Sequence, residues 1–233
     1  MTNFNDVVSQ FRIEGTVESV SPIGNGLINE TLRVKTVDAN TPDYILQRIN
    51  NAIFTDVDLL QHNIELVTDH IRHKLMEKGE TDIERKCLRF VQAKDGKTYY
   101  KDADNLYWRV SVFIPNAVTK EEVNPESAFC CGETFGNFQN MLVDLKEPLG
   151  ETIPDFHNME LRLRQLREAV SADKAGRVAS VKDMIAELES YADEMCLAER
   201  LYREGALPKR ICHCDTKVNN MMFDKDGKVL CVI

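Results

Sequence analysis

Hydrophobic and polar residues alternate along much of the first half of the chain. A period of two places successive side chains on opposite faces of a β-strand. Five stretches follow this pattern or form short apolar runs, and turn-forming residues separate them. The expected strands cover residues 16–20, 31–37, 44–49, 87–91 and 106–114.

A different spacing occupies the stretch from Asp56 to Lys78. Its apolar residues recur every three or four positions, which predicts one amphipathic helix between the third and fourth strands. Gly79 is expected to end this helix. The first 114 residues therefore predict a small antiparallel sheet with a single helix.

Helical spacing dominates after Pro115, and strand-like patterns return near the end of the chain. The expected helices cover residues 127–146, 158–170 and 175–204, and the expected final strands lie within 210–223 and at 229–233. Asp224-Lys-Asp-Gly227 is typical of a hairpin turn. The chain is thus expected to be α+β, with an N-terminal lobe at 1–114 and a mainly helical lobe at 115–233.

The amino-acid composition and net charge of the chain argue against several classes of protein. Of 233 residues, 43% are apolar and 29% charged, which is typical of a globular protein. The net charge of −9 argues against nonspecific binding to nucleic acid or to an anionic membrane. No apolar run approaches the roughly 20 residues that span a bilayer. Seven cysteines and no signal peptide predict free thiols in the cytoplasm.

The segment from His213 to Asn220 carries the densest group of chemically useful side chains. An aspartate followed five residues later by an asparagine is the spacing of a kinase catalytic loop. Asp215 would accept or orient the proton of an acceptor hydroxyl, and the carbonyl oxygen of Asn220 would reach a magnesium ion. Lys217 would meet the charge that develops on the transferred phosphoryl group.

The same segment has plainer interpretations. Asp215 and Asn219-Asn220 are residue types that commonly form turns between strands. The cluster Cys212-His213-Cys214 contains metal-binding residue types, but structural zinc sites pair two spaced knuckles and the sequence offers no second Cys/His pair. We therefore do not expect a zinc site here.

Two features of the first lobe are candidates for binding a nucleotide. Gly24 and Gly26 lie in the turn between the first two strands, where they could form either a plain tight turn or a loop whose backbone amides approach phosphates. Glu65 lies on the predicted helix and could pair with a basic residue of the preceding strand. A solvated surface glutamate is the commoner reason for a single helical Glu.

The order of these parts resembles the aminoglycoside phosphotransferase and choline kinase group of the protein-kinase-like fold. Several runs are most similar to one branch, the N-acetylhexosamine 1-kinases, and the similarity covers about Phe11 to Ile233. These runs are Gly24-Asn-Gly-Leu-Ile-Asn29, Tyr44-Ile-Leu-Gln47, Trp108-Arg-Val110, Phe135-Gly-Asn-Phe-Gln139, Glu151-Thr-Ile-Pro-Asp-Phe-His157 and His213-Cys-Asp-Thr-Lys-Val-Asn-Asn220.

The resemblance implies a bilobed enzyme that transfers the γ-phosphate of ATP to the anomeric hydroxyl of an N-acetylhexosamine. Asp215 would contact the sugar and act as the catalytic base, and Asn220 would bind Mg²⁺. Backbone groups of Phe113 and Ile114 would hold the adenine. Asn29 would contact the sugar.

The resemblance also implies a residue of the third strand that faces the nucleotide. Gln47 and Arg48 are the candidates, and strand alternation allows only one of them to face that side. Which of the two does so is left open by the sequence.

Relatives in this group continue beyond the position of Ile233, so the sequence is expected to be a fragment, with a second metal-binding acid next in line. An alternative hypothesis is a kinase-like binding protein without catalytic activity. Choline, homoserine and aminoglycosides are alternative acceptors. We expect a monomer or weak self-association through the apolar strand at 229–233.

Overall fold

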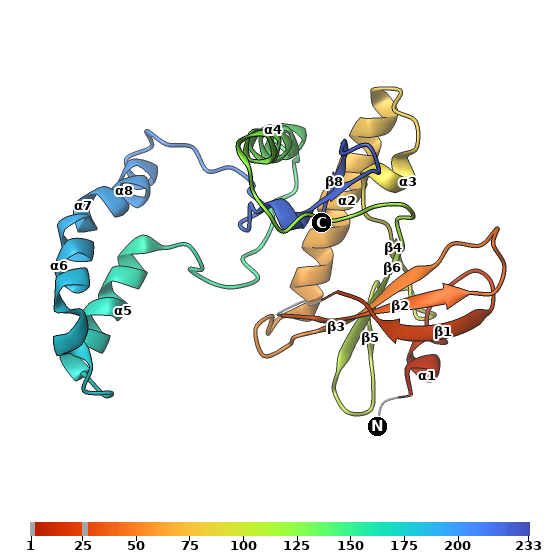
Figure 1. Cartoon of the computed structure of the whole chain (residues 1–233), viewed down its shortest axis with the longest axis horizontal. Helices are drawn as coiled ribbons and strands as arrows, with labels where there is room; N and C mark the ends of the chain where they lie inside the picture. The colour runs from red at the N-terminus through yellow and green to blue at the C-terminus, as the bar shows by residue number, and fades with distance from the viewer. Residues whose placement is uncertain (1–2, 25–27) are drawn as a thin grey trace. The chain divides into compact units, whose positions relative to one another are not determined.

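The computed structural model describes residues 3–24 and 28–233, and it divides into two compact units (Figure 1). The first unit contains Met1–Thr152 together with Ile211–Ile233, and the second contains Ile153–Arg210. The boundary expected between residues 114 and 115 falls inside the first unit. The last 23 residues thus pack with the sheet-bearing part of the chain.

An antiparallel sheet forms the centre of the first unit. Its strand order is β1-β2-β3-β6-β4, and β5 also pairs with β6. The strands are β1 (Val17–Pro22), β2 (Glu30–Thr36), β3 (Tyr44–Ile49), β4 (Phe90–Val91), β5 (Tyr100–Lys101) and β6 (Tyr107–Val112). The five expected strands are confirmed, and the short β5 is an addition that the sequence pattern did not predict.

The expected strand at 87–91 is reduced to two residues. Ile83–Lys86 forms a short helix, α3, and Cys87 ends it with an extended backbone. The helix uses residues that lead into the predicted strand, and only Phe90 and Val91 pair with β6.

One face of the sheet carries the main hydrophobic core. Leu46, Val34 and Val110 are completely buried, and Trp108 lies beside them at 1% exposure. The N-terminal helix α1 (Phe4–Val8) contributes Val7 and Val8 to this cluster. This face of the sheet is therefore closed by α1.

The long helix α2 (Val57–Glu77) contacts the opposite face through Gln61, which reaches Arg109 of β6. Asp56 begins the helix because its side chain accepts a hydrogen bond from the backbone N–H of Leu59 at 2.9 Å. Gly79, at φ +69°, follows its end, as expected. The predicted helix at 56–78 is confirmed.

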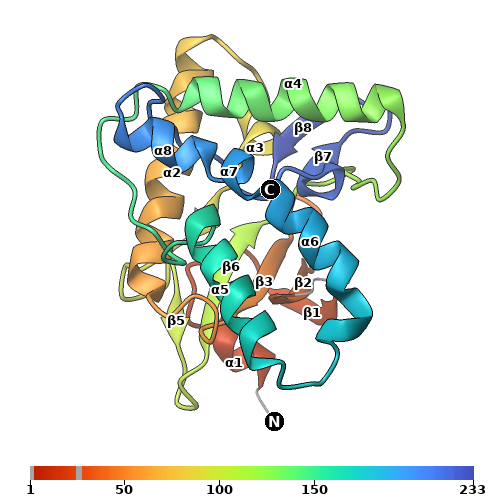
Figure 2. The same cartoon turned by 90° about the vertical axis from the view of Figure 1, so that its left-hand side faces the viewer.

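Helix α4 (Pro125–Met141) packs beside the last hairpin, which consists of β7 (Met221–Phe223) and β8 (Val229–Val232) (Figure 2). Asn124 and Ser127 form a reciprocal capping box at its start. The helix stops at Met141 rather than at 146, and Asp144 beyond it pairs with Lys74 and His70 of α2.

The second unit consists of helices. They are α5 (Met159–Ala172), the 3-10 turn η1 (Val178–Val181), α6 (Lys182–Ser190), α7 (Ala192–Met195) and α8 (Leu197–Arg203). The prediction of one long helix at 175–204 is wrong. Tyr191 and Cys196 have ψ near 0°, and these two residues interrupt the helical hydrogen bonding.

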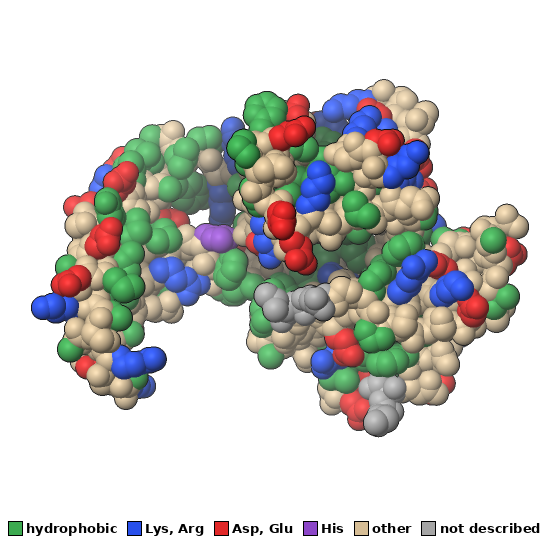
Figure 3. Space-filling model, viewed as in Figure 1, with side chains coloured by type: hydrophobic (Ala, Val, Ile, Leu, Met, Phe, Trp, Pro, Cys, Tyr) green, Lys and Arg blue, Asp and Glu red, His purple; other side chains and the backbone are tan. Residues whose placement is uncertain are grey.

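The surface mixes charges of both signs in the first unit and exposes apolar side chains in the second (Figure 3). Pairs such as Arg72 and Glu84, whose atoms lie 2.6 Å apart, join opposite charges. Met184, Tyr191 and Tyr202 are among the exposed apolar residues of the second unit. Among the described residues, none of the helices is long and apolar enough to cross a bilayer.

Candidate active site

The loop that precedes β7 brings three predicted side chains together. The Lys217 ammonium lies 2.9 Å from Oδ2 of Asp215. The side-chain amide of Asn220 donates to the same oxygen at 2.9 Å and to the backbone carbonyl of Asp215 at 2.8 Å. The spacing of five residues therefore places the aspartate and the asparagine side by side.

The Asp215 carboxylate is charged and accessible. The hydrogen bond from Lys217 lowers its pKa, burial opposes this shift, and the hydrogen bond from Asn220 adds to it. About half of each side chain is open to solvent, with 56% exposure for Asp215 and 51% for Lys217. A carboxylate with these properties can accept a proton from a hydroxyl group that approaches the loop.

Tertiary contacts support the loop from beneath. Val218 and Met221 are buried against Phe135 of α4. Residues Val218–Asn220 form a 3-10 turn, η2, and the backbone carbonyl of Asn220 accepts a hydrogen bond from the N–H of Ile233 at 2.9 Å. These contacts fix the end of the loop that carries Asn220.

His213 fixes the other end of the loop. Its Nε2 lies 3.0 Å from the carbonyl oxygen of Ile233, so Nε2 carries the proton and donates it. The ring also packs against Phe135 and Phe138, with centroids 5.2 Å and 5.8 Å away. His213 is therefore a support of the loop.

The strand predicted before the loop does not form, and that prediction is wrong. Cys214 has φ +68°, a left-handed conformation that an extended strand cannot contain. The chain bends sharply at this residue, immediately before Asp215. Among the described residues, no three His, Cys, Asp or Glu side chains are grouped so as to hold a metal ion.

The alternatives at the third strand are now distinguished. Gln47 lies on the face contacted by α2, where it accepts a hydrogen bond from Arg109 at 3.0 Å. Arg48 lies on the opposite face and forms an exposed ion pair with Glu30 at 2.8 Å. Strand alternation thus turns Arg48 away from α2 and Gln47 toward it, while a contact of either residue with a nucleotide stays a prediction.

Glu65 also departs from its expected partner. Its carboxylate accepts a hydrogen bond from the Thr98 hydroxyl, and no ion pair joins it to β3 among the described residues. The Thr98 hydroxyl and backbone carbonyl in turn accept hydrogen bonds from the Gln61 amide at 3.0 Å and 3.1 Å. The expected pairing of Glu65 with a basic residue of β3 is therefore replaced by hydrogen bonds through the uncharged side chains of Thr98 and Gln61.

Arg109 is a further polar residue of this face, and no sequence motif indicates it. It lies in β6 directly opposite Gln47, and it donates to Gln47 and, at 3.4 Å, to Gln61. The sequence feature that could have indicated this position is an arginine between the apolar residues Trp108 and Val110. Alternation places such a side chain opposite the hydrophobic core, on the face contacted by α2.

The turn between β1 and β2 is described in part. Gly24 has φ +70° and open space around its Cα, and Gly26 lies outside the described residues. The side-chain oxygen of Asn29 accepts a hydrogen bond from the backbone N–H of Asn50 at 3.0 Å. Asn29 thus ties the start of β2 to the end of β3.

Phe113 and Ile114 form the segment expected to hold adenine, and one of their backbone N–H groups already donates a hydrogen bond within the protein. The N–H of Phe113 donates to the carbonyl oxygen of Asp43 at 2.9 Å, and Ile114 is buried. The guanidinium of Arg33 lies over the Phe113 ring at 4.3 Å. The remaining backbone groups of this pair are the ones that a base could use.

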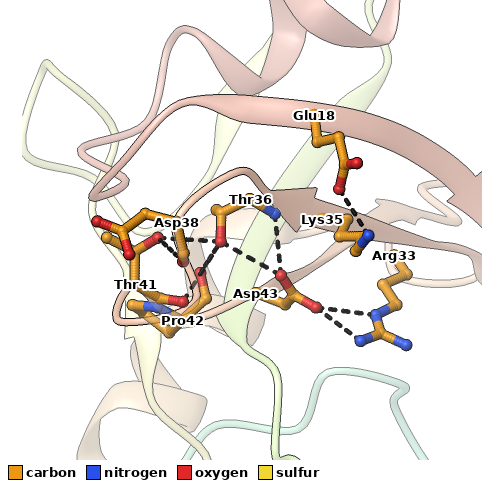
Figure 4. Close-up of polar contacts among 8 residues, drawn as sticks. All are labelled: Glu18, Arg33, Lys35, Thr36, Asp38, Thr41, Pro42 and Asp43. Carbon is orange, nitrogen blue, oxygen red and sulfur yellow. Dashed lines mark hydrogen bonds and ion pairs between the residues drawn. The ribbon is translucent and has the colours of Figure 1, made fainter.

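Asp43 holds this region together through its side chain (Figure 4). Arg33 donates to its carboxylate at 2.6 Å and 3.1 Å, and the backbone N–H of Thr36 donates at 2.9 Å. Burial works to raise the pKa of Asp43, but the hydrogen bonds from Thr36 and Arg33 outweigh it and lower the pKa. The carboxylate is therefore charged at neutral pH.

Residues 19–233, which include both the sheet and the loop at 213–220, match the model of the phosphotransferase enzyme family, APH. The chain belongs to this family. Its fold is protein-kinase-like, with an antiparallel sheet in the N-terminal part followed by helices.

Solved structures of other phosphotransferases share the fold at low sequence identity. A spectinomycin phosphotransferase in complex with ADP and spectinomycin matches all of this chain with 11% identity and a TM-score of 0.58. An aminoglycoside phosphotransferase from Alicyclobacillus acidocaldarius matches all of it with 20% identity and a TM-score of 0.54. An amicoumacin kinase in complex with AMP-PNP and Ca²⁺ matches 99% of it, with 14% identity and a TM-score of 0.57.

This phosphotransferase chain is shorter than those proteins. It spans 68% of the spectinomycin enzyme, 65% of the Alicyclobacillus enzyme and 62% of the amicoumacin kinase. The shared part includes the sheet, the loop and the final hairpin.

Proposed function

We propose that this phosphotransferase moves the γ-phosphoryl group of ATP to a hydroxyl group of a small molecule. The observation that supports it most is the contact of Asp215 with both Lys217 and Asn220 on one supported loop. Phosphoryl transfer depends mainly on positioning and electrostatic stabilisation, and a firmly held polar loop supplies both.

Each side chain of the loop has a distinct role in the proposed reaction. The acceptor oxygen forms a bond to the γ-phosphorus while the bond from that phosphorus to the bridging oxygen of ADP breaks. Asp215 receives the proton of the acceptor hydroxyl. Lys217, now paired with Asp215, balances negative charge on the phosphoryl group as it moves.

The loop residues also fit a magnesium ion. The amide nitrogen of Asn220 is occupied by Asp215, which leaves its carbonyl oxygen Oδ1 as the atom that faces a cation. Mg²⁺ prefers oxygen ligands and takes only one or two from a protein when substrate phosphates supply others. When bound, the ion would neutralise phosphate charge. Asn220 is the residue that would hold it.

For the acceptor, we propose the anomeric hydroxyl of an N-acetylhexosamine, with Asn29 as a contact. The similarity of the sequence runs to N-acetylhexosamine 1-kinases supports this choice. Aminoglycosides are the second candidate class, because the spectinomycin and Alicyclobacillus enzymes share the fold. Choline and homoserine complete the panel of acceptors to be tested.

The test is the substitution Asp215→Asn in an assay of ADP release over this acceptor panel. We expect N-acetylhexosamines to stimulate ADP release, and the variant to lose about 10²- to 10⁴-fold in turnover. Asp226→Asn is the matched control, since Asp226 is an exposed residue of the turn between β7 and β8. Unchanged turnover in Asp215→Asn would overturn the assignment of the base.

A second outcome separates catalysis from binding. Calorimetry with MgATP on the same chain measures whether the nucleotide binds when no transfer occurs. Binding without ADP release for any acceptor would support the alternative of a kinase-like binding protein. The absence of both binding and ADP release would overturn the proposed function.

A further inference from the structure

Arg109 occupies an unusual position on the sheet face contacted by α2. Three directly paired residues of adjacent strands, Thr31, Gln47 and Arg109, form one row across that face. Gln47 donates to the Thr31 hydroxyl at 3.1 Å and accepts from Arg109 at 3.0 Å. We call these three residues the polar row.

Arg109 forms no ion pair with any described residue, and its guanidinium lies over the Phe90 ring at 5.4 Å from the centroid. Its hydrogen bonds go to the neutral amide oxygens of Gln47 and Gln61, and no carboxylate pairs with it among the described residues. Burial alone lowers its pKa to about 10, so the guanidinium remains positive at neutral pH. The other arginines of the same sheet differ, because Arg33 pairs with Asp43 and Arg48 with Glu30.

Arg109 is half-buried, and a partly desolvated charge without a counter-charge lowers the stability of a fold, a cost that an apolar residue or an internal ion pair avoids. The nearest acid in the hydrogen-bond chain is Glu65, which is separated from Arg109 by Gln61 and Thr98. The arrangement therefore keeps a positive charge available on this face. An anion from solution is the partner that would complete it.

The polar row also lies at a particular end of the sheet. Thr31 is the second residue of β2, and its backbone carbonyl accepts from the N–H of Ile23, next to Gly24. The row is thus adjacent to the hairpin end of β1 and β2. An anion held there would lie beside Gln47 and Thr31, whose amide and hydroxyl groups are hydrogen-bond donors.

We propose that Arg109 is the fixed positive charge of the nucleotide phosphate site, and that it acts through Gln47 as a positioning residue. The inference rests on the proposed function, and it supplies the basic residue for which Gln47 and Arg48 of the third strand were the candidate positions. The chemical class that the row would recognise is the polyphosphate of a nucleoside triphosphate. The nucleoside itself would gain nothing from this charge.

A comparison of a nucleoside triphosphate with its nucleoside therefore tests the proposed role of Arg109. Calorimetry compares MgATP with adenosine for the whole chain and for Arg109→Gln, which removes the charge but keeps an amide donor. We expect MgATP affinity to fall about 10- to 100-fold and adenosine affinity to change less than about twofold. Arg109→Lys, which keeps the charge, should recover part of the MgATP affinity.

A second variant tests whether MgATP binding requires the positive charge of Arg109 to be unpaired within the protein. Gln47→Glu places a carboxylate beside Arg109 that still accepts the hydrogen bond from Arg109, whereas the Thr31 hydroxyl, to which Gln47 donates, would become the donor. MgATP affinity should fall at least as far as in Arg109→Gln, while the melting temperature stays equal or rises. Arg12→Gln is the matched control, because Arg12 is exposed and also donates only to neutral oxygens, those of Gln92 and Lys94.

The outcomes are distinct. Equal losses for MgATP and adenosine in Arg109→Gln would show a purely structural role and overturn the inference. Unchanged MgATP affinity in both Arg109→Gln and Gln47→Glu would also overturn it, and the proposed function would stand. Failure of the unsubstituted chain to bind MgATP would instead overturn the proposed function, and the inference with it.

Discussion

The two polar groups of the first unit are built in opposite ways. The loop group, Asp215, Lys217 and Asn220, comes from six consecutive residues and is half exposed. The group around Arg109 comes from β2, β3, β6, α2 and the segment before β5, and Gln61 at its centre is 2% exposed. Local hydrogen bonds shape the first group, whereas tertiary packing assembles the second.

Stability and activity should respond differently to substitutions in these two groups. An exposed polar contact exchanges readily with water and contributes little to the free energy of unfolding. A buried polar group left without its partner keeps the full cost of desolvation. Substitutions in the loop should therefore impair the reaction more than the fold, and substitutions around Arg109 should affect both.

The single tryptophan makes the comparison measurable. Trp108 is buried in the core of the sheet, so its fluorescence reports the unfolding of the first unit in urea. Each variant below is compared with the unsubstituted chain by this signal.

The largest effect is expected for Gln61→Ala. The change removes the hydrogen bonds that Gln61 forms with Arg109 and with Thr98, and it opens a cavity beneath α2. The free energy of unfolding should fall by about 2–4 kcal/mol. Gln92→Ala, at an exposed position, is the control and should stay within about 0.5 kcal/mol. A change in the free energy of unfolding of Gln61→Ala as small as that of the control would contradict the expectation that the group around Arg109 stabilises the fold more than the loop group does.

Asp43→Asn should have the next largest effect, a loss of about 1–3 kcal/mol at pH 7, because the charged hydrogen bonds with Arg33 and Thr36 are weakened. The pKa of Asp43 is lowered in the folded state, so its stabilisation is complete above the unfolded pKa near 3.8. It is lost as the pH falls through the lower folded pKa. The difference between variant and unsubstituted chain should shrink below about pH 4; a constant difference from pH 7 to 3 would contradict this.

Asn220→Ala should lower the free energy of unfolding by less than about 1 kcal/mol, because its hydrogen bonds to Asp215 are exposed. The same variant should require more Mg²⁺ for half-maximal ADP release. A loss of stability as large as that of Gln61→Ala would show that the loop supports the fold.

The smallest effect is expected for Arg48→Gln. Both Arg48 and its ion-pair partner Glu30 have exposed side chains, so the free energy of unfolding should change by less than about 0.5 kcal/mol. Addition of salt should reduce even this difference. A loss above 1 kcal/mol would mean that this pair is part of a larger network.

Much of the fold could be predicted because its elements follow local patterns. Alternation identified β3 at its observed bounds, and the three- and four-residue spacing identified α2 to within a residue or two. The helix pattern over 175–204 failed because periodicity does not show where single residues such as Tyr191 leave the helical conformation. The strand before Asp215 failed for the same reason, at Cys214.

The amino-acid sequence alone was enough to predict which side chains meet in the loop, since Asp215, Lys217 and Asn220 are close along the chain and a short turn brings them into contact. It could not determine that Gln47 rather than Arg48 lies on the side of α2, or that Arg109 would be its partner 62 residues later. Strand pairing and register decided both. They depend on which strands become neighbours, and that is a property of the whole sheet rather than of any single segment.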